Sequence, residues 1–324
     1  MRIGFGVTIE KQDDPYVQMA IDVEDATANG GAPGATFLDY FPWLRYLPHW
    51  LPWTGPLRHA RNSIKPIQAL HDIPWKATEP DILNGRAQYP SFMRTHLEKY
   101  IRNEKEGRAN EASIADLKGA AGAIAVAGGN TTWSTIIICI LNMIRDPDVQ
   151  KKAQKEIDEV IGGERLPNFE DRAKLPYLEN IIKETTRWAP LSPVGVPHAS
   201  VEDDTYDGMF IPAGSVIYAN AWAMCHDETI YRDPDAFNPD RYTPREQGGA
   251  GEPAPEGPFG FGRRVCPGQI LATAGVYIMM ATILATMDLL PGVGPNGEVV
   301  IPEVKLSNGL SRYVTIAIRI SSKN

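Results

Sequence analysis

The longest hydrophobic pattern in the chain is an uncharged run from residue 119 to residue 144. By length alone this run could cross a membrane as a helix. Small and polar residues gather near its middle, however, and unpaired polar groups are expensive in hydrocarbon. They are Gly128, Gly129, Asn130, Thr131 and Thr132. We therefore expect a long helix through a protein core, opened at its centre to hold a water and a diatomic ligand, rather than a membrane span.

Other helices are predicted by apolar positions that recur every three or four residues. Residues 91–107 form an amphipathic pattern that ends at a glycine, and residues 147–161 follow Asp146, a favourable helix cap. The apolar run from 270 to 287 predicts a further helix.

β-structure is expected only in short pieces. Tyr206-Asp-Gly208 predicts a turn, Ser215 to Met224 is β-rich, and residues 314–320 alternate like an edge strand. The pattern therefore predicts a mainly α fold with small β-sheets, of the α+β class. We expect a single domain over 1–324, with central helices at about 1–110, the long helix at about 115–145 and the remainder at 146–324.

Composition agrees with a globular body. The chain has 324 residues, of which 43% are hydrophobic, and a net charge of −8, which argues against a nucleic-acid partner. Three cysteines imply no disulfide framework and favour a reducing compartment. The six histidines show no metal-ligand spacing.

The stretch from Phe259 to Gly268 surrounds one cysteine with the groups that an iron-bound thiolate needs. A thiolate is stabilised by positive potential, and the predicted helix after residue 268 points its N-terminus at Cys266. Gly262 and Gly268 let the backbone approach a flat ligand, Arg264 offers a forked cation for a carboxylate, and Phe259 can shield the sulfur. Chance would produce these five residues at these offsets about once in ten million windows. The alternative is a buried structural cysteine beside a glycine-rich turn.

This stretch resembles the haem-ligand loop of the cytochrome P450 monooxygenases, whose axial thiolate favours O–O cleavage. The resemblance implies that haem b (iron protoporphyrin IX) is the cofactor and that Cys266 is its axial ligand. It implies the same cofactor-binding role for Phe259, Gly262, Arg264 and Gly268.

A second resemblance lies in Glu184-Thr-Thr-Arg187, where a spacing of three places an acid and a base on one helical face. It precedes Phe237-Asn-Pro-Asp-Arg241-Tyr242, as in the family. The resemblance implies that Glu184, Arg187 and Arg241 form a structural triad that locks the fold around the haem loop. The alternative is a solvated helix pair worth about 0.3 to 0.5 kcal/mol.

In the long uncharged run, the resemblance identifies the distal helix. Its threonine, matched here by Thr131, hydrogen-bonds oxygen and relays protons, while Ala127 borders the substrate pocket. The family usually has an acid before this threonine, whereas this chain has Asn130, which cannot release a proton. Thr131, Thr132 and water could still conduct protons.

The segment from Pro190 to His198 is rich in proline and glycine, which predicts an extended chain leading into a strand. By resemblance, Val194 and Gly195 line the substrate pocket and His198 reaches a haem propionate. A surface or capping histidine is the alternative for His198. Leu310, in the segment 306–310, resembles the last substrate-contacting turn of the family.

The resemblance covers the whole chain and begins near the fifth lettered helix of the family. It implies that the amino-terminal third is missing, including the membrane anchor and a helix whose tryptophan and arginine hold a propionate. Residues 42–64 resemble the lid that touches the membrane surface, most closely in the fungal microsomal branch. The full-length parent would therefore lie on the cytosolic face of the endoplasmic reticulum membrane.

The resemblance implies a monooxygenase that inserts one oxygen atom from O2 into a lipophilic small molecule. An NADPH-dependent flavoprotein reductase would supply the electrons. Two alternatives remain: a catalytically silent haem-binding or scaffold fragment, and an oxygen-independent haem-thiolate isomerase or dehydratase. Asn130 fits either alternative.

Overall fold

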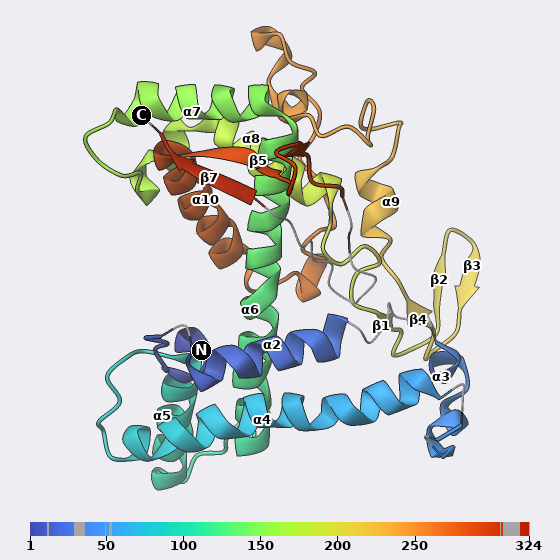
Figure 1. The fold of residues 1–324 in the computed structure, drawn as a ribbon. Helices are drawn as coiled ribbons and strands as arrows, with labels where there is room; N and C mark the ends of the chain where they lie inside the picture. The colour runs from blue at the N-terminus through green and yellow to red at the C-terminus, as the bar shows by residue number, and fades with distance from the viewer. Residues whose placement is uncertain are drawn as a thin grey trace. The chain divides into compact units, whose positions relative to one another are not determined.

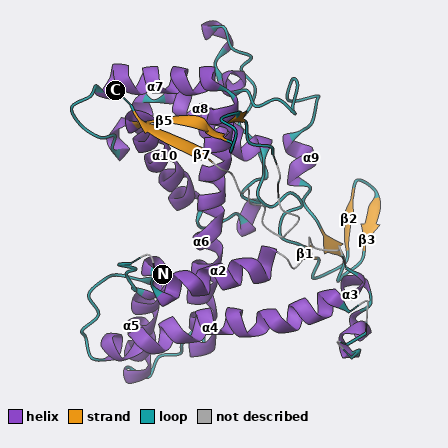
Figure 2. Ribbon diagram, viewed as in Figure 1, coloured by secondary structure: helices purple, strands orange, loops and turns teal. Residues whose placement is uncertain are grey.

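The computed structural model describes residues 1–11, 13–28, 36–48, 50–51, 54–304, 306 and 318–323. Helices dominate and the sheets are small and antiparallel, which confirms the mainly α, α+β fold class (Figures 1 and 2). The chain divides into two compact units, Met1–Asn130 and Thr131–Asn324. The single domain expected over 1–324 stays a prediction.

The first unit is helical. Its elements are α1 (Arg2–Phe5), α2 (Pro15–Ala28), α3 (Phe37–Tyr40), η1 (Pro42–Tyr46), α4 (Gly55–Leu83), α5 (Phe92–Lys105) and the start of α6 (Ile114–Arg145). The amphipathic helix expected at 91–107 is α5, and the Ser91 hydroxyl caps it by accepting from the Arg94 N–H at 3.1 Å. Its buried cluster consists of Phe5, Trp75, Ile82, Met93, Leu97, Leu117 and Ala121.

In the second unit, four helices share one core. They are the end of α6, α7 (Pro147–Ile161), α8 (Pro176–Trp188) and α10 (Gln269–Thr286). The predicted cap of α7 is present, because the Asp146 carboxylate accepts from two N–H groups at 3.2 Å. α10 buries Val276, Tyr277, Met280 and Leu284, and each such side chain contributes about 1.5–3 kcal/mol.

Shorter helical segments connect these helices. They are η2 (Phe169–Lys174), α9 (Ala221–Cys225), η3 (Pro239–Tyr242), η4 (Arg245–Gln247) and η5 (Gly262–Arg264).

Among the described residues, three small sheets complete the second unit. β1 (His198–Ala199) pairs with β4 (Val216–Ile217), and β2 (Asp204–Tyr206) pairs with β3 (Met209–Ile211) across the expected turn. β5 (Met287–Val293) lies between β6 (Val299–Val300) and β7 (Ile318–Ser322). The buried Gln150 side chain of α7 binds both the N–H and the carbonyl of Leu289 in β5, at 2.7 and 3.0 Å. This pair of bonds ties the sheet to the helical core.

The strand expected from Ser215 to Met224 is largely wrong. Only Val216 and Ile217 are in a strand, and α9 begins at Ala221. The Asn220 side chain accepts from the Ala223 N–H at 3.0 Å, and this helix cap outweighs the β-propensity of the preceding residues.

The segment before His198 also differs from expectation. It turns instead of extending, because the Gly195 N–H donates to the Ser192 carbonyl at 3.0 Å and Gly195 has φ +65°. Of the edge strand expected at 314–320, only 318–320 lie within the described residues, where they belong to β7.

The opening expected at the centre of the long helix is absent, since α6 is an uninterrupted α-helix across Gly128 and Gly129. Helix formation is cooperative, and the flanking turns propagate through two glycines that cost about 1 kcal/mol each. α6 and α10 are long and apolar enough to cross a membrane by length and composition. Both also contribute buried residues to the core of the second unit, as core helices of soluble proteins do.

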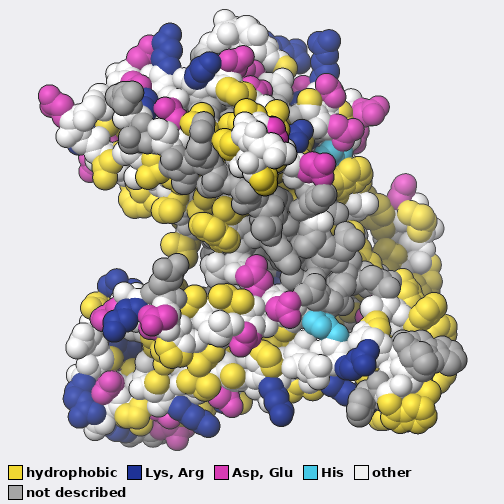
Figure 3. Space-filling view, in the orientation of Figure 1, with side chains coloured by type: hydrophobic (Ala, Val, Ile, Leu, Met, Phe, Trp, Pro, Cys, Tyr) yellow, Lys and Arg dark blue, Asp and Glu magenta, His cyan; other side chains and the backbone are white. Residues whose placement is uncertain are grey.

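Aromatic side chains are exposed around α3 and η1. Phe37, Tyr40, Trp43 and Tyr46 are between 63% and 78% exposed. Figure 3 shows hydrophobic side chains on the surface at this end of the first unit. A contiguous apolar surface of this kind is typical of a contact with another protein or a membrane.

Candidate haem-binding site

The loop that contains Cys266 is closed by backbone hydrogen bonds. The Cys266 N–H donates to the Phe259 carbonyl at 2.7 Å, and the Val265 N–H donates to the Gly262 carbonyl at 3.2 Å. Gly260 and Gly262 have φ values of +78° and +54°, a left-handed conformation in which a side chain would be strained. The loop is therefore shaped by its backbone, and the Cys266 side chain is exposed.

The sulfur lies against the first turn of α10. Gly268 caps this helix, and a Cβ atom placed on Gly268 would lie 3.7 Å from the Cys266 Sγ. The unpaired N–H groups at a helix N-terminus carry a partial positive charge of about half a unit, which favours a thiolate. Arg264, in η5, adds an exposed guanidinium to the same loop.

The three cysteines differ in what they can bind. Burial raises the pKa of Cys139 to about 12 and that of Cys225 to about 11, so both are neutral thiols at physiological pH. Cys266 is the exposed cysteine, and apart from the adjoining residues of the chain no heavy atom of the described residues lies within 4 Å of a Cβ built on Gly262. The donor and the open backbone beside it fit a haem that has Cys266 as its sulfur ligand.

The residues predicted to lie on the distal side of the haem belong to α6. Ala127 is exposed, whereas Asn130, Thr131 and Thr132 are partly buried. The Thr135 hydroxyl donates to the Thr131 carbonyl at 3.0 Å, a bond back to the preceding turn that bends helices slightly.

α10 runs from the cysteine loop to a close approach with α6. A Cβ placed on Gly275 would lie 3.4 Å from the Cγ2 of Thr132, so the two helices approach closely at this glycine. Gly275 is seven residues after Gly268, which corresponds to roughly 10 Å along a helix. One rigid helix therefore connects the sulfur loop with the polar turn of α6.

The structure brings Glu184, Arg187 and Arg241 together in a buried network. The Arg187 guanidinium donates to both carboxylate oxygens of Glu184 at 2.8 Å, and the Arg241 Nε donates to Glu184 Oε1 at 3.0 Å. Their side chains are at most 1% exposed. Both arginines also donate to the Ala236 carbonyl, at 3.2 and 3.1 Å, so the network holds the backbone that precedes η3.

Two members of this network were missed by the sequence reasoning. The Tyr242 hydroxyl donates to Glu184 Oε2 at 2.9 Å, and the Glu252 carboxylate accepts from Arg241 Nη1 at 2.6 Å. Burial, followed by the charge of Glu184, raises the pKa of Tyr242 far above its usual value, so it remains a hydrogen donor. The position of Tyr242 directly after Arg241 could have indicated its role, but no local signal marks Glu252.

Three other predicted residues lie on or beside β1. His198 is exposed in this strand, and Val194 and Gly195 are partly buried in the turn before it. A Cβ on Gly195 would lie 3.3 Å from the Ala219 carbonyl oxygen, which together with its positive φ explains the glycine. Leu310 lies outside the described residues.

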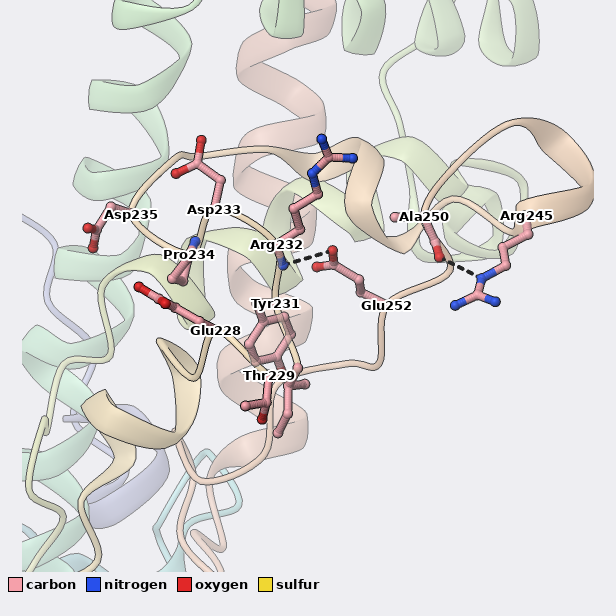
Figure 4. A pocket seen from close by; sticks show the side chains of 11 residues that line it. Glu228, Thr229, Tyr231, Arg232, Asp233, Pro234, Asp235, Arg245, Ala250 and Glu252 are labelled. Carbon is pink, nitrogen blue, oxygen red and sulfur yellow. Dashed lines mark hydrogen bonds between the residues drawn. The ribbon is translucent and has the colours of Figure 1, made fainter.

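A cavity of about 540 Å³ lies elsewhere in the second unit (Figure 4). It is lined mainly by charged residues and contains none of the predicted site residues. The Arg232 N–H donates to Glu252 at 3.1 Å and Arg245 donates to the Ala250 carbonyl at 3.0 Å, both drawn in Figure 4. Since Glu252 also binds Arg241, this cavity borders the structural network and not the chemistry of Cys266.

Comparisons with known proteins agree with the geometry. A family model described as Cytochrome P450 matches residues 1–299. A cytochrome P450 monooxygenase of Armillaria gallica is 39% identical over 305 residues, which are 94% of this chain and 58% of the relative. Cytochrome P450 monooxygenase 105 of Postia placenta is also 39% identical, over 95% of this chain and 58% of the relative. The chain thus spans 58% of the length of these two relatives.

Proposed function

Because this chain belongs to the cytochrome P450 family, we propose that the protein is a haem-thiolate monooxygenase acting on a lipophilic small molecule. One oxygen atom of O2 enters the substrate and the other leaves as water. The observation that carries the proposal is the exposed sulfur of Cys266 beside the N-terminus of α10. When bound, haem supplies the oxygen chemistry, with a thiolate ligand that favours O–O cleavage.

The residues of the chain have separate tasks in this proposal. Cys266 would hold the iron, the N-terminus of α10 would keep its sulfur anionic, and Phe259 would shield that sulfur from water. Gly262 and Gly268 would let the backbone approach the macrocycle. Arg264 and His198 would bind the haem propionates through charge-assisted hydrogen bonds to their carboxylates. The network of Glu184, Arg187 and Arg241 keeps the loop in place.

The distal side manages oxygen and protons. Thr131 and Thr132 present hydroxyl groups, each able to donate and accept, on the partly buried turn of α6. Asn130 precedes them and holds no transferable proton. Ala127, Val194, Gly195 and Leu310 would contact the substrate, and their lack of charge fits an apolar molecule.

Electrons come from NADPH through a flavoprotein reductase. The exposed aromatic residues of α3 and η1 suit a membrane surface, which supports a location on the cytosolic face of the endoplasmic reticulum. A lipophilic substrate would concentrate in the same membrane.

Asn130 favours a second candidate, a haem-thiolate isomerase or dehydratase that uses neither O2 nor a reductase. Such an enzyme has no need for an acid at this position. NADPH consumption distinguishes the two, since only the monooxygenase requires it.

The first test is spectroscopic. The reduced carbon-monoxide complex of the haem-loaded protein should show the red-shifted Soret band of thiolate ligation, and Cys266→Ser should abolish it. Cys225→Ala is the matched control and should keep the band, because the Cys225 thiol is buried and neutral. A red-shifted band in Cys266→Ser would reject the ligand assignment.

The second test is chemical. With a reductase and labelled ¹⁸O2, a panel of lipophilic molecules should include one that gains a single labelled oxygen at the expense of NADPH. Conversion of a substrate without NADPH or label would establish the isomerase or dehydratase instead.

A further inference from the structure

Helix α10 is anchored along its later turns and open at its start. Tyr277, Met280 and Leu284 are buried in the core that α10 shares with the end of α6 and with α7 and α8 (Figure 1). Ile270 and Leu271, in the first turn, are 84% and 57% exposed. A push against α10 ahead of this core would therefore tilt its N-terminal end, which carries the cysteine loop, and leave the rest of the helix in place.

Gly275 stands at the edge of the buried part of α10. A Cβ placed on it would lie 3.4 Å from the Cγ2 of Thr132 in α6, slightly inside the usual contact distance of about 3.5–4.0 Å between carbon atoms. A valine would add two more carbon atoms beyond that Cβ. Glycine destabilises a helix interior relative to alanine, and this close contact is a physical reason for a glycine here.

The contact also fixes the side chain of Thr132. Its Cβ carries both the methyl and the hydroxyl group, so the place of the methyl against α10 sets the direction of the hydroxyl. Thr132 is partly buried, and its hydroxyl forms no hydrogen bond with the residues that the structure describes. The hydroxyl is therefore held in one direction while it remains available to a bound molecule.

We propose that Gly275 is a positioning residue that sets how closely α10 approaches the Thr131-Thr132 turn of α6. It thereby fixes the separation between the sulfur of Cys266 and the hydroxyl groups of that turn, between which haem and oxygen would lie. The proposal rests on the proposed monooxygenase function. It concerns a single contact within the second unit, since both residues of the contact belong to Thr131–Asn324.

The first experiment tests the contact without turnover, by thermal unfolding of haem-loaded protein. Gly275→Val should lower the midpoint by about 2 to 10 °C, because it overpacks the approach of the two helices. Thr132→Ser removes the Cγ2 methyl and keeps the hydroxyl. Combining the two substitutions should recover more than half of the loss caused by valine, measured against Thr132→Ser alone. If the two effects simply added, the methyl would not limit the approach, and the proposal would be overturned.

Gly119→Val is the matched control. Gly119 also lies inside a helix, α6, but apart from its own helix and its neighbours in the chain no heavy atom of the described residues lies within 4 Å of a Cβ placed on it. Its midpoint should stay within about 2 °C of wild type, since valine is no worse than glycine in a helix. An equal loss at both positions would attribute the effect to valine itself.

The second experiment measures coupling with a reductase and a substrate. Gly275→Val should keep the red-shifted Soret band of the reduced carbon-monoxide complex, because Cys266 is unchanged. The product formed per NADPH should fall about tenfold or more, because the reacting groups are misplaced. Adding Thr132→Ser should restore this ratio to that of Thr132→Ser alone. A purely structural glycine would reduce the yield of haem-loaded protein and leave the product formed per NADPH unchanged.

A smaller substitution keeps the test open if the valine variant does not fold. Gly275→Ala places only a methyl group at 3.4 Å, so it should fold, bind haem and couple less well than wild type, again with recovery by Thr132→Ser. If wild type oxidised a substrate and Gly275→Val or Gly275→Ala coupled equally well, this proposal would fail and the monooxygenase function would stand. If wild type oxidised no substrate with NADPH, the monooxygenase function would fail, and the thermal comparison would still decide whether the contact exists.

Discussion

The Glu184 carboxylate accepts two hydrogen bonds from the Arg187 guanidinium, each 2.8 Å long, and both side chains are fully excluded from solvent. A paired charge in this position is stable only while its partners remain, because an unpaired buried charge has no water to solvate it. The pair is joined by Arg241, Tyr242 and Glu252, so α8, η3 and the loop after it depend on one another.

Removing the Glu184 carboxylate should strongly destabilise the second unit. We expect Glu184→Ala to lower the free energy of unfolding by about 3 to 5 kcal/mol, measured from urea denaturation. Glu98→Ala is the control, because its pair with Arg94 on α5 is 3.0 Å long but 34% and 49% exposed. That variant should lose about 0.3 to 0.5 kcal/mol. Equal losses would mean that the Glu184 network is solvated.

Substituting phenylalanine for Tyr242 and for Tyr177 should change the free energy of unfolding in different ways. Tyr242→Phe removes a hydroxyl that donates to Glu184 and should cost about 1.5 to 3 kcal/mol. The Tyr177 hydroxyl is buried without a hydrogen-bond partner among the described residues, so Tyr177→Phe should be neutral or stabilising. Thermal and urea denaturation of both variants measure the difference. A stabilised Tyr242→Phe protein would contradict the hydrogen bond.

Thiol reactivity should single out Cys266. At about pH 8, iodoacetamide should alkylate Cys266 in haem-free protein, because it is exposed, and bound haem should protect it. Cys139 and Cys225 should react only after unfolding, since burial raises the pKa of each to about 12 and 11. Peptide mass spectrometry reads out the sites. Haem that left Cys266 as reactive as before would show that the sulfur is not its ligand.

The contribution of the Asp171 carboxylate to folding stability should be lost below about pH 4 as the carboxylate is protonated. Two hydrogen bonds from Arg165, both 2.7 Å, and one from the Asn168 N–H lower the pKa of Asp171 from 3.8 to about 2. A depressed pKa stabilises the folded state above the unfolded value, and this contribution is lost as pH falls from about 4 to 2.

The matched comparison is with Asp171→Asn, whose stability deficit relative to wild type should be constant above pH 4 and shrink below it. Urea midpoints at a series of pH values measure this deficit. A deficit that stayed unchanged down to pH 2.5 would show that the carboxylate is not bound as described.

Local patterns in the sequence were sufficient for several features. Apolar periodicity predicted α5 and α7, because an amphipathic helix needs only one buried face. A continuous apolar run predicted α10. The spacing of residues 259–268 indicated a thiolate loop, since the chemistry of a cysteine ligand depends on groups close in the chain. The same local reasoning failed for residues 215–224, where the cap at Asn220 started a helix.

Contacts between distant segments were decided by tertiary structure alone. Glu252 reaches Arg241, and Gly275 approaches Thr132, only because helices and loops pack in one particular arrangement. The sequence by itself determined which groups could ligate a haem and which helices could form. The folded chain decided which charges are buried together, because burial and its electrostatic consequences depend on every segment that excludes water from a group.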